Sequence, residues 1–127
     1  MMEFFAVGVG GFIGSCLRFA LTKLTALRPI AFPMATLLAN VIAGFFAGFL
    51  LGFEQQSVSL PPRVKLFLST GILGGLSTFS TFSVETVRLF GEGHFGMALL
   101  NVALNLGLSL LGVAAGMLCA RLVFRRA

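Results

Sequence analysis

Charged side chains are scarce in this sequence, and their scarcity excludes most classes of protein. Only 10% of the 127 residues are Asp, Glu, Lys or Arg, while 57% are hydrophobic. A soluble domain carries roughly 25% charged residues, so four acidic and nine basic side chains cannot cover a soluble surface of this size. A soluble enzyme, a disordered chain and a coiled coil are therefore excluded, and an integral membrane protein remains.

Other absences narrow the chemistry. Trp and Tyr, the usual interfacial anchors, are missing, although the chain has 15 Phe. The two cysteines, Cys16 and Cys119, lie near opposite ends of the chain without CxxC spacing, and the single histidine, His94, has no second ligand nearby in the sequence. We therefore expect neither a disulfide nor a His/Cys metal site.

Four stretches are long enough to span a membrane, which takes about 20 mostly apolar residues. We expect a single all-α transmembrane domain, 1–127, with helices at about 4–24, 33–53, 64–90 and 96–124. The third stretch contains several glycines followed by LSTFSTFS, a composition that disfavours a continuous helix. The sequence therefore predicts a break near 74–78, and such breaks are where membrane proteins tend to build ion sites.

Polar side chains occur at mid-membrane positions. Asn40 lies in the middle of the second stretch with Thr36 one turn before it, and Asn101, Asn105 and Ser109 form a stripe with four-residue spacing in the fourth. An amide in hydrocarbon is costly unless it finds partners. Asn40 alone is equally well explained by an interhelical hydrogen bond, whereas three aligned polar groups favour a lined path.

Two phenylalanines and two ionisable residues complete the candidate set. Phe79 and Phe82 are three residues apart among Ser and Thr. Packing is the ordinary role of such a pair; alternatively, their positive ring edges and nearby donors form a neutral cage for a small anion, weak enough to release it. Arg18 is expected to snorkel to the interface, and Glu85 fits either a pore vestibule or a structural ion pair.

Basic residues are nearly balanced between the two sides of the membrane. With four spans, one side holds five bases and the other holds up to four. These are Arg63, Lys65, Arg121, Arg125 and Arg126 on one side, and Lys23, Arg28, Arg88 and Arg18 on the other. The difference is a weak topology signal, so the chain could insert in both orientations and form an antiparallel homodimer.

Three motifs resemble one known family. They are GGFIGSCLRF over 10–19, TLLANVIAGFFAG over 36–48 and GILGGLSTFSTFSVE over 71–85. Together they resemble the Fluc (CrcB-type) bacterial fluoride channels, and the resemblance covers the whole chain. It implies a dual-topology antiparallel homodimer in the bacterial inner membrane. Two pores would export fluoride passively, conferring fluoride resistance without enzymatic activity.

The resemblance also implies roles for particular residues. Those along the fluoride path would be Asn40, Phe79, Phe82, Thr36, Ser109 and Asn105, although Asn105 departs from the hydroxyl expected at its position. The backbone carbonyls of Gly74 and Ser77 would hold one buried sodium ion at the dimer centre. Lipid, fluoride and a second copy of the chain are then its partners, with no nucleic acid.

Two other functions fit a short four-helix membrane protein. Small dual-topology multidrug exporters need a membrane-embedded Glu in the first helix together with Trp and Tyr, whereas Glu3 lies at the extreme N-terminus here. A non-transporting subunit of a larger complex is disfavoured by the polar stripe and the expected break. Flux without a proton or counter-ion gradient separates a channel from the exporter, and conduction by the purified chain alone excludes the subunit.

Overall fold

The structure, a computed structural model, describes residues 1–27, 30–56 and 59–124. Within these ranges every regular element is helical, and four helical segments are long and apolar enough to cross a membrane. The chain is therefore a multi-pass membrane protein, as its composition predicts. Arg28, Arg125 and Arg126, which enter the charge balance, lie outside the described residues.

Three of the four segments are single helices. They are α1 (Met2–Ala26), α2 (Met34–Glu54) and α6 (Phe95–Val123). The short connection into α6 is built on Gly93, whose φ of 79° is a left-handed conformation that glycine adopts without a steric penalty. The N–H groups of Gly93 and His94 bond back to the carbonyls of Phe90 and Leu89, which ends the preceding helix and reverses the chain.

The third segment is a composite. It consists of α3 (Pro62–Leu66), the π-helix η1 (Phe67–Leu73), α4 (Gly74–Leu76) and α5 (Phe79–Gly91). Ser77 and Thr78 separate the last two in extended conformation, with ψ values of 153° and 110°. This confirms the break that the glycine, serine and threonine cluster predicts. The π-helix has no counterpart in the sequence-based prediction.

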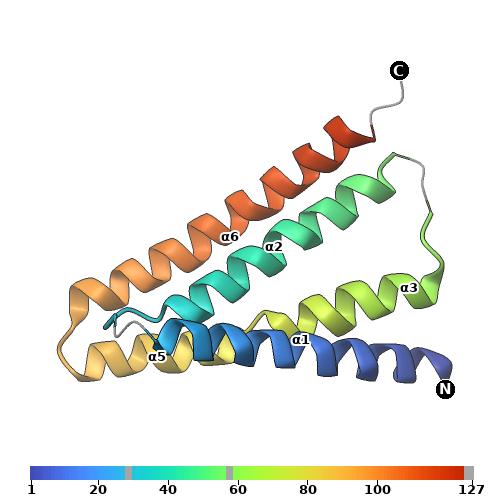
Figure 1. Cartoon of the computed structure of the whole chain (residues 1–127). Helices are drawn as coiled ribbons and strands as arrows, with labels where there is room; N and C mark the ends of the chain where they lie inside the picture. Colours follow the sequence, from blue (N-terminus) through green and yellow to red (C-terminus); the bar gives the residue numbers. More distant parts are fainter. Residues whose placement is uncertain (28–29, 57–58, 125–127) are drawn as a thin grey trace.

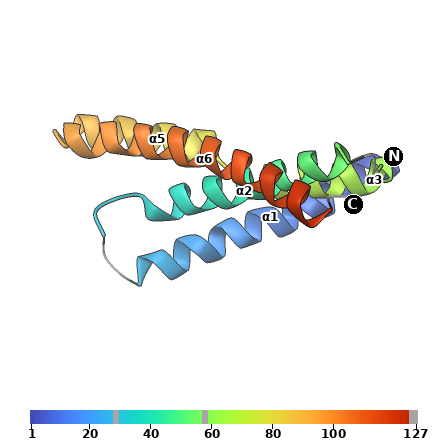
Figure 2. The same cartoon turned by 90° about the horizontal axis from the view of Figure 1, so that it is seen from above.

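The break passes the chain from one half of the molecule to the other. Before it, η1 and α4 pack against α1; after it, α5 packs on α6, which also runs along α2. We call the first group the α1 arm (α1, α3, η1 and α4) and the second the α6 arm (α2, α5 and α6). In Figure 1 the two arms diverge towards the end that holds both termini, and Figure 2 shows α5 beside α6 and away from α1.

Each arm is held by backbone contacts at glycines. In the α1 arm, a Cβ on Gly14 would lie 2.9 Å from the Leu76 nitrogen, and one on Gly71 would lie 2.8 Å from the Gly10 Cα. In the α6 arm, a Cβ on Gly44 would lie 2.9 Å from the Ser109 carbonyl oxygen. Small residues spaced by four thus let these helices approach closely, which is how helices associate in lipid.

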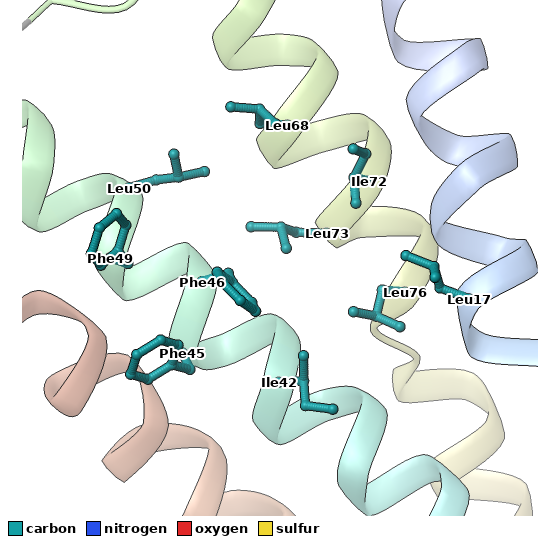
Figure 3. Close-up of a pocket in the computed structure, with 10 residues that line it drawn as sticks. All are labelled: Leu17, Ile42, Phe45, Phe46, Phe49, Leu50, Leu68, Ile72, Leu73 and Leu76. Atoms are coloured by element: carbon teal, nitrogen blue, oxygen red, sulfur yellow. The ribbon is translucent and has the colours of Figure 1, made fainter. Parts of the chain in front are cut away.

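The space between the arms holds an apolar cavity of about 470 Å³. Figure 3 shows the α2 side chains Phe46 and Phe49 on one side of it, and Ile72 and Leu73 of η1 on the other. Leu17 of α1 closes it near the break. Every residue that lines it is apolar, so nothing in this cavity can replace the hydration of an ion.

Candidate functional site: a polar groove at the break of the third segment

Asn40 of α2 binds the backbone of the break at Thr78. The backbone N–H of Thr78 donates to Asn40 Oδ1 at 2.8 Å, and Asn40 Nδ2 lies 3.4 Å from the Thr78 carbonyl oxygen. Thr78 also caps α5, because its hydroxyl oxygen accepts from the N–H of Thr81 at 3.2 Å. The break is thus stabilised by side chains where an unbroken helix would use its own backbone.

A line of hydrogen bonds runs on from Asn40 through α6 to α5. Asn40 Nδ2 donates to Asn105 Oδ1 at 2.9 Å, and Asn105 Nδ2 donates to Asn101 Oδ1 at 2.8 Å. Asn101 Nδ2 donates to the Thr86 hydroxyl at 2.9 Å, and that hydroxyl donates to the Phe82 carbonyl at 2.8 Å. We call these four bonds, together with the bond from the Thr78 N–H to Asn40, the asparagine line. Asn101 is completely buried, so the α6 end of the line is shielded from the groove.

A groove of about 670 Å³ opens beside the asparagine line. Five of the six residues expected along an ion path line it: Asn40, Phe79, Phe82, Asn105 and Ser109. The ring centroids of Phe79 and Phe82 are 5.5 Å apart with the rings tilted by 51°. Phe79 is 79% exposed in the single chain, so this large apolar ring is left without cover at the groove.

The sixth expected residue, Thr36, lies apart from the groove. It is buried, and its hydroxyl donates to Glu85 Oε1 at 2.8 Å. Among the described residues, the other carboxylate oxygen, Glu85 Oε2, is buried without a partner, and so is the hydroxyl of Ser109. Ser109 therefore carries an unused donor beside the groove. An unsatisfied buried polar atom in a native site calls for a functional explanation.

Gly74 and Ser77, the expected sodium ligands, flank the break and line the same groove. In an unbroken helix the Gly74 carbonyl would accept from the N–H of Thr78, four residues on. That N–H donates to Asn40 instead. The Ser77 carbonyl likewise loses its helical donor, because the N–H of Thr81 donates to Thr78 Oγ1. Two carbonyl oxygens are therefore released from the helical pattern within four residues.

The remaining candidates lie away from this groove. Arg18 is half-buried on α1, and within the described ranges the ion pair that forms joins Lys65 to Glu54 at 3.0 Å. Cys16 and Cys119 are free thiols. Among the described residues no group of three His, Cys, Asp or Glu could hold a metal ion, so the chemistry of this site is that of neutral amides, hydroxyls, rings and carbonyls.

Two members of the asparagine line were not identified as site residues from the sequence. Asn101 falls in the polar stripe, but its burial and its bond to α5 depend on how closely the helices pack. Thr86 lies beside Glu85 near the end of the third segment, where a hydroxyl is unremarkable. Its only sequence signal is its position one turn after Phe82.

Comparison with known proteins places the chain in a family. The model of the CrcB-like protein family, described as Camphor Resistance (CrcB), matches residues 5–117. A protein of Clostridium perfringens named fluoride-specific ion channel FluC is 43% identical over 93% of both chains. Its namesakes from Elusimicrobium minutum and Pseudomonas putida are 44% identical over 97% of both chains and 47% identical over 88% of both chains. The chain belongs to the CrcB-like family.

Proposed function

We propose that this chain forms a fluoride-selective channel, in keeping with the names of its relatives. One observation carries the proposal. Asn40, which holds the break of the third segment, lines one groove together with Phe79 and Phe82. This arrangement offers an anion an amide donor, ring edges and no fixed positive charge, a combination that replaces hydration without binding too tightly for release.

The side chains that line the groove have different roles in fluoride conduction. Asn40 donates to the ion as it passes the break, because one of its two amide hydrogens has only a 3.4 Å contact. Phe79 and Phe82 narrow the path, which excludes the larger chloride ion. The free hydroxyl of Ser109 supplies a further donor along α6. Thr36 and Glu85 are hydrogen-bonded to each other between α2 and α5, outside the groove, and tie these two helices together.

The proposed channel is an antiparallel homodimer. The groove and the apolar cavity both lie in the wedge between the arms, and a ring as exposed as Phe79 needs a partner surface. The near balance of basic residues between the two sides permits both orientations in one membrane. A reporter of cytoplasmic location fused after Ala127 is expected to give a mixed signal, and a single uniform orientation would contradict the dimer.

The break also fits one structural sodium ion. The carbonyls of Gly74 and Ser77 have lost their helical donors, and carbonyl oxygens suit a hard monovalent cation. A two-fold axis at the break would bring four such oxygens together. The bound ion would then take the place of the hydrogen-bond donors that these carbonyls have lost. An experimental density map is expected to show one cation on the axis. Carbonyls that point apart, or that accept from backbone donors, would refute this.

Efflux from liposomes that contain only this purified chain tests the function. Fluoride is expected to leave freely without a proton or counter-ion gradient, while chloride is retained. Passive flux of this kind in the bacterial inner membrane would lower cytoplasmic fluoride and confer resistance. Strict dependence on a gradient would favour a coupled exporter of the multidrug type instead, and absence of flux would leave a subunit of a larger complex.

A further inference from the structure

The chain contains only three asparagines, and all three belong to the asparagine line. The line connects α5, α2 and α6 and returns to α5, and each of its five bonds is 2.8 or 2.9 Å long. In order, its members are Thr78, Asn40, Asn105, Asn101, Thr86 and Phe82. It therefore begins at the N-cap of α5, the helix that carries both rings of the groove, and ends within that helix.

The first end of the line determines how the Asn40 amide is turned. The group at this end is the backbone N–H of Thr78, which can only donate. Asn40 must therefore present its carbonyl oxygen to Thr78 and its NH₂ group to Asn105. Asn105 in turn must present its own oxygen to Asn40.

The second end imposes the same direction independently. The hydroxyl hydrogen of Thr86 is committed to the Phe82 carbonyl, which can only accept, so the Thr86 oxygen is left as an acceptor. Asn101 must therefore turn its NH₂ group to Thr86 and its oxygen to Asn105. The two ends agree, and every amide between them has one satisfied orientation.

Counting hydrogens separates the two amides that line the groove. The NH₂ group of Asn105 donates to Asn101 Oδ1 at 2.8 Å and also lies 3.2 Å from the Asn101 carbonyl, so both of its hydrogens are in use. Asn40 commits one hydrogen to Asn105, while the other makes only the 3.4 Å contact to Thr78. Asn40 thus has a hydrogen to offer an anion, and Asn105 does not.

We propose that Asn101 and Thr86 are positioning residues that act on the ion only through the asparagine line, by fixing the orientation of Asn40. In the same line, Asn105 serves as an acceptor for Asn40 and donates nothing to the ion. The inference rests on the proposed fluoride function for its consequence, but the orientation itself is a property of the protein without any ion. Neither Asn101 nor Thr86 lines the groove, so neither can act by contact.

Thr86→Val is the sharpest variant, because valine keeps the shape of the side chain and removes only the hydroxyl. Thr86→Ser, which keeps the hydroxyl, is the matched control. Selective labelling of asparagine with ¹⁵N gives just three side-chain amide signals, which single Asn→Asp variants assign. We expect Thr86→Val to move the Asn40 signal, although two other amides lie between them, and Thr86→Ser to leave it in place.

Transport is measured in parallel with the same variants. Loss of the last bond of the line should weaken donation by Asn40 by the amount of one modest hydrogen bond, so fluoride efflux is expected to fall by about threefold for Thr86→Val. Thr86→Ser is expected to conduct like the parent. A change confined to the Asn101 signal, with unchanged Asn40 signal and unchanged efflux, would overturn the proposal.

The parent protein supplies a second measurement that needs no variant to fold. Sodium fluoride added to the labelled parent is expected to shift the weakly held hydrogen of Asn40, which makes the 3.4 Å contact to Thr78, and to leave both hydrogens of Asn105 nearly unmoved. A larger shift at Asn105 would overturn its assignment as an acceptor. If fluoride moves no signal and the parent carries no flux, the proposed function fails, while the response of Asn40 to Thr86→Val still decides whether the asparagine line exists.

Discussion

The third segment has two halves that are joined by two residues yet held in different ways. The half before the break, 62–76, is fastened to α1 by backbone contacts at glycines. The half after it, 79–91, takes part in hydrogen bonds from side chains of α2 and α6. Close backbone packing requires small residues and gives the fold its shape, whereas a polar network requires complete satisfaction and gives a site its chemistry. Changes in the first half should therefore damage assembly, and changes around the second should damage conduction.

The largest expected effect is the loss of fluoride efflux in Asn40→Asp, which tests the polar network around the second half of the third segment. A carboxylate can still accept from the Thr78 N–H, so the break survives, but its charge repels an anion by about 4 kcal/mol at 4 Å in a medium of dielectric constant near 20. Fluoride efflux should fall by about 100-fold or more. Gln55→Glu, the same chemical change at an exposed position, should leave efflux intact. Efflux within twofold of the parent for Asn40→Asp would remove Asn40 from the path.

Gly14→Ala tests the close backbone packing between α1 and the first half of the third segment. The added methyl would meet the Ile72 carbonyl and the Leu76 nitrogen of the α1 arm, and overpacking of this kind costs about 1–3 kcal/mol. The unfolding midpoint in a denaturing-detergent titration should fall accordingly. Gly8→Ala on the same helix meets nothing within 4 Å and should be neutral or stabilising, since alanine favours the helix. Equal midpoints for the two variants would show that the close contact is not needed.

Phe82→Ile tests whether the aromatic ring of Phe82 in the groove contributes to fluoride conduction. Isoleucine keeps the apolar bulk and removes the positive ring edge, so efflux should fall about tenfold, a barrier change of about 1.4 kcal/mol, while the chain still folds. Phe90→Ile, on the same helix but outside the groove and paired with Phe95, should conduct normally. If both variants conduct alike, Phe82 is a packing residue and the second half is less specialised than we propose.

Ser109→Ala should have the smallest effect and separates conduction from stability most cleanly. The Ser109 hydroxyl is buried with no partner in the part of the chain that the structure describes, so its removal should not lower the unfolding midpoint. One donor fewer along the groove should reduce efflux by about threefold, the effect of one modest hydrogen bond. Ser15→Ala, on an exposed position of α1, should change neither quantity. A loss of stability without a loss of efflux would reverse the assignment of Ser109.

Much of the fold could be predicted from the sequence because the membrane leaves few choices. Apolar length sets the four spans, and the glycine, serine and threonine cluster predicts the break that lies at Ser77 and Thr78. The π-helix of Phe67–Leu73 could not be predicted, because no side-chain pattern distinguishes it from an α-helix. It depends on how the backbone fits against α1.

The site is less completely predictable. Residue type and four-residue spacing bring Asn40, Asn105 and Ser109 to attention, and the structure does place them along one groove. The pairing of Thr36 with Glu85 and the bond from Asn101 to Thr86 depend on distances between helices. Spacing along one helix carries no information about such distances. Residues that act through others are therefore the ones that sequence reasoning overlooks.

The π-helix has a consequence for which changes of chain length the protein can tolerate. Its i→i+5 bonds hold one residue more per closed turn than the α-helical i→i+4 pattern. Deletion of a single residue within Phe67–Leu73 can thus be absorbed by conversion to a regular turn. The same deletion within Gly74–Leu76 would rotate the chain on one side of it by about 100° relative to the other. That rotation would carry Thr78 away from Asn40. Natural length variation in the third segment should therefore collect in the π-helix and avoid the three residues before the break.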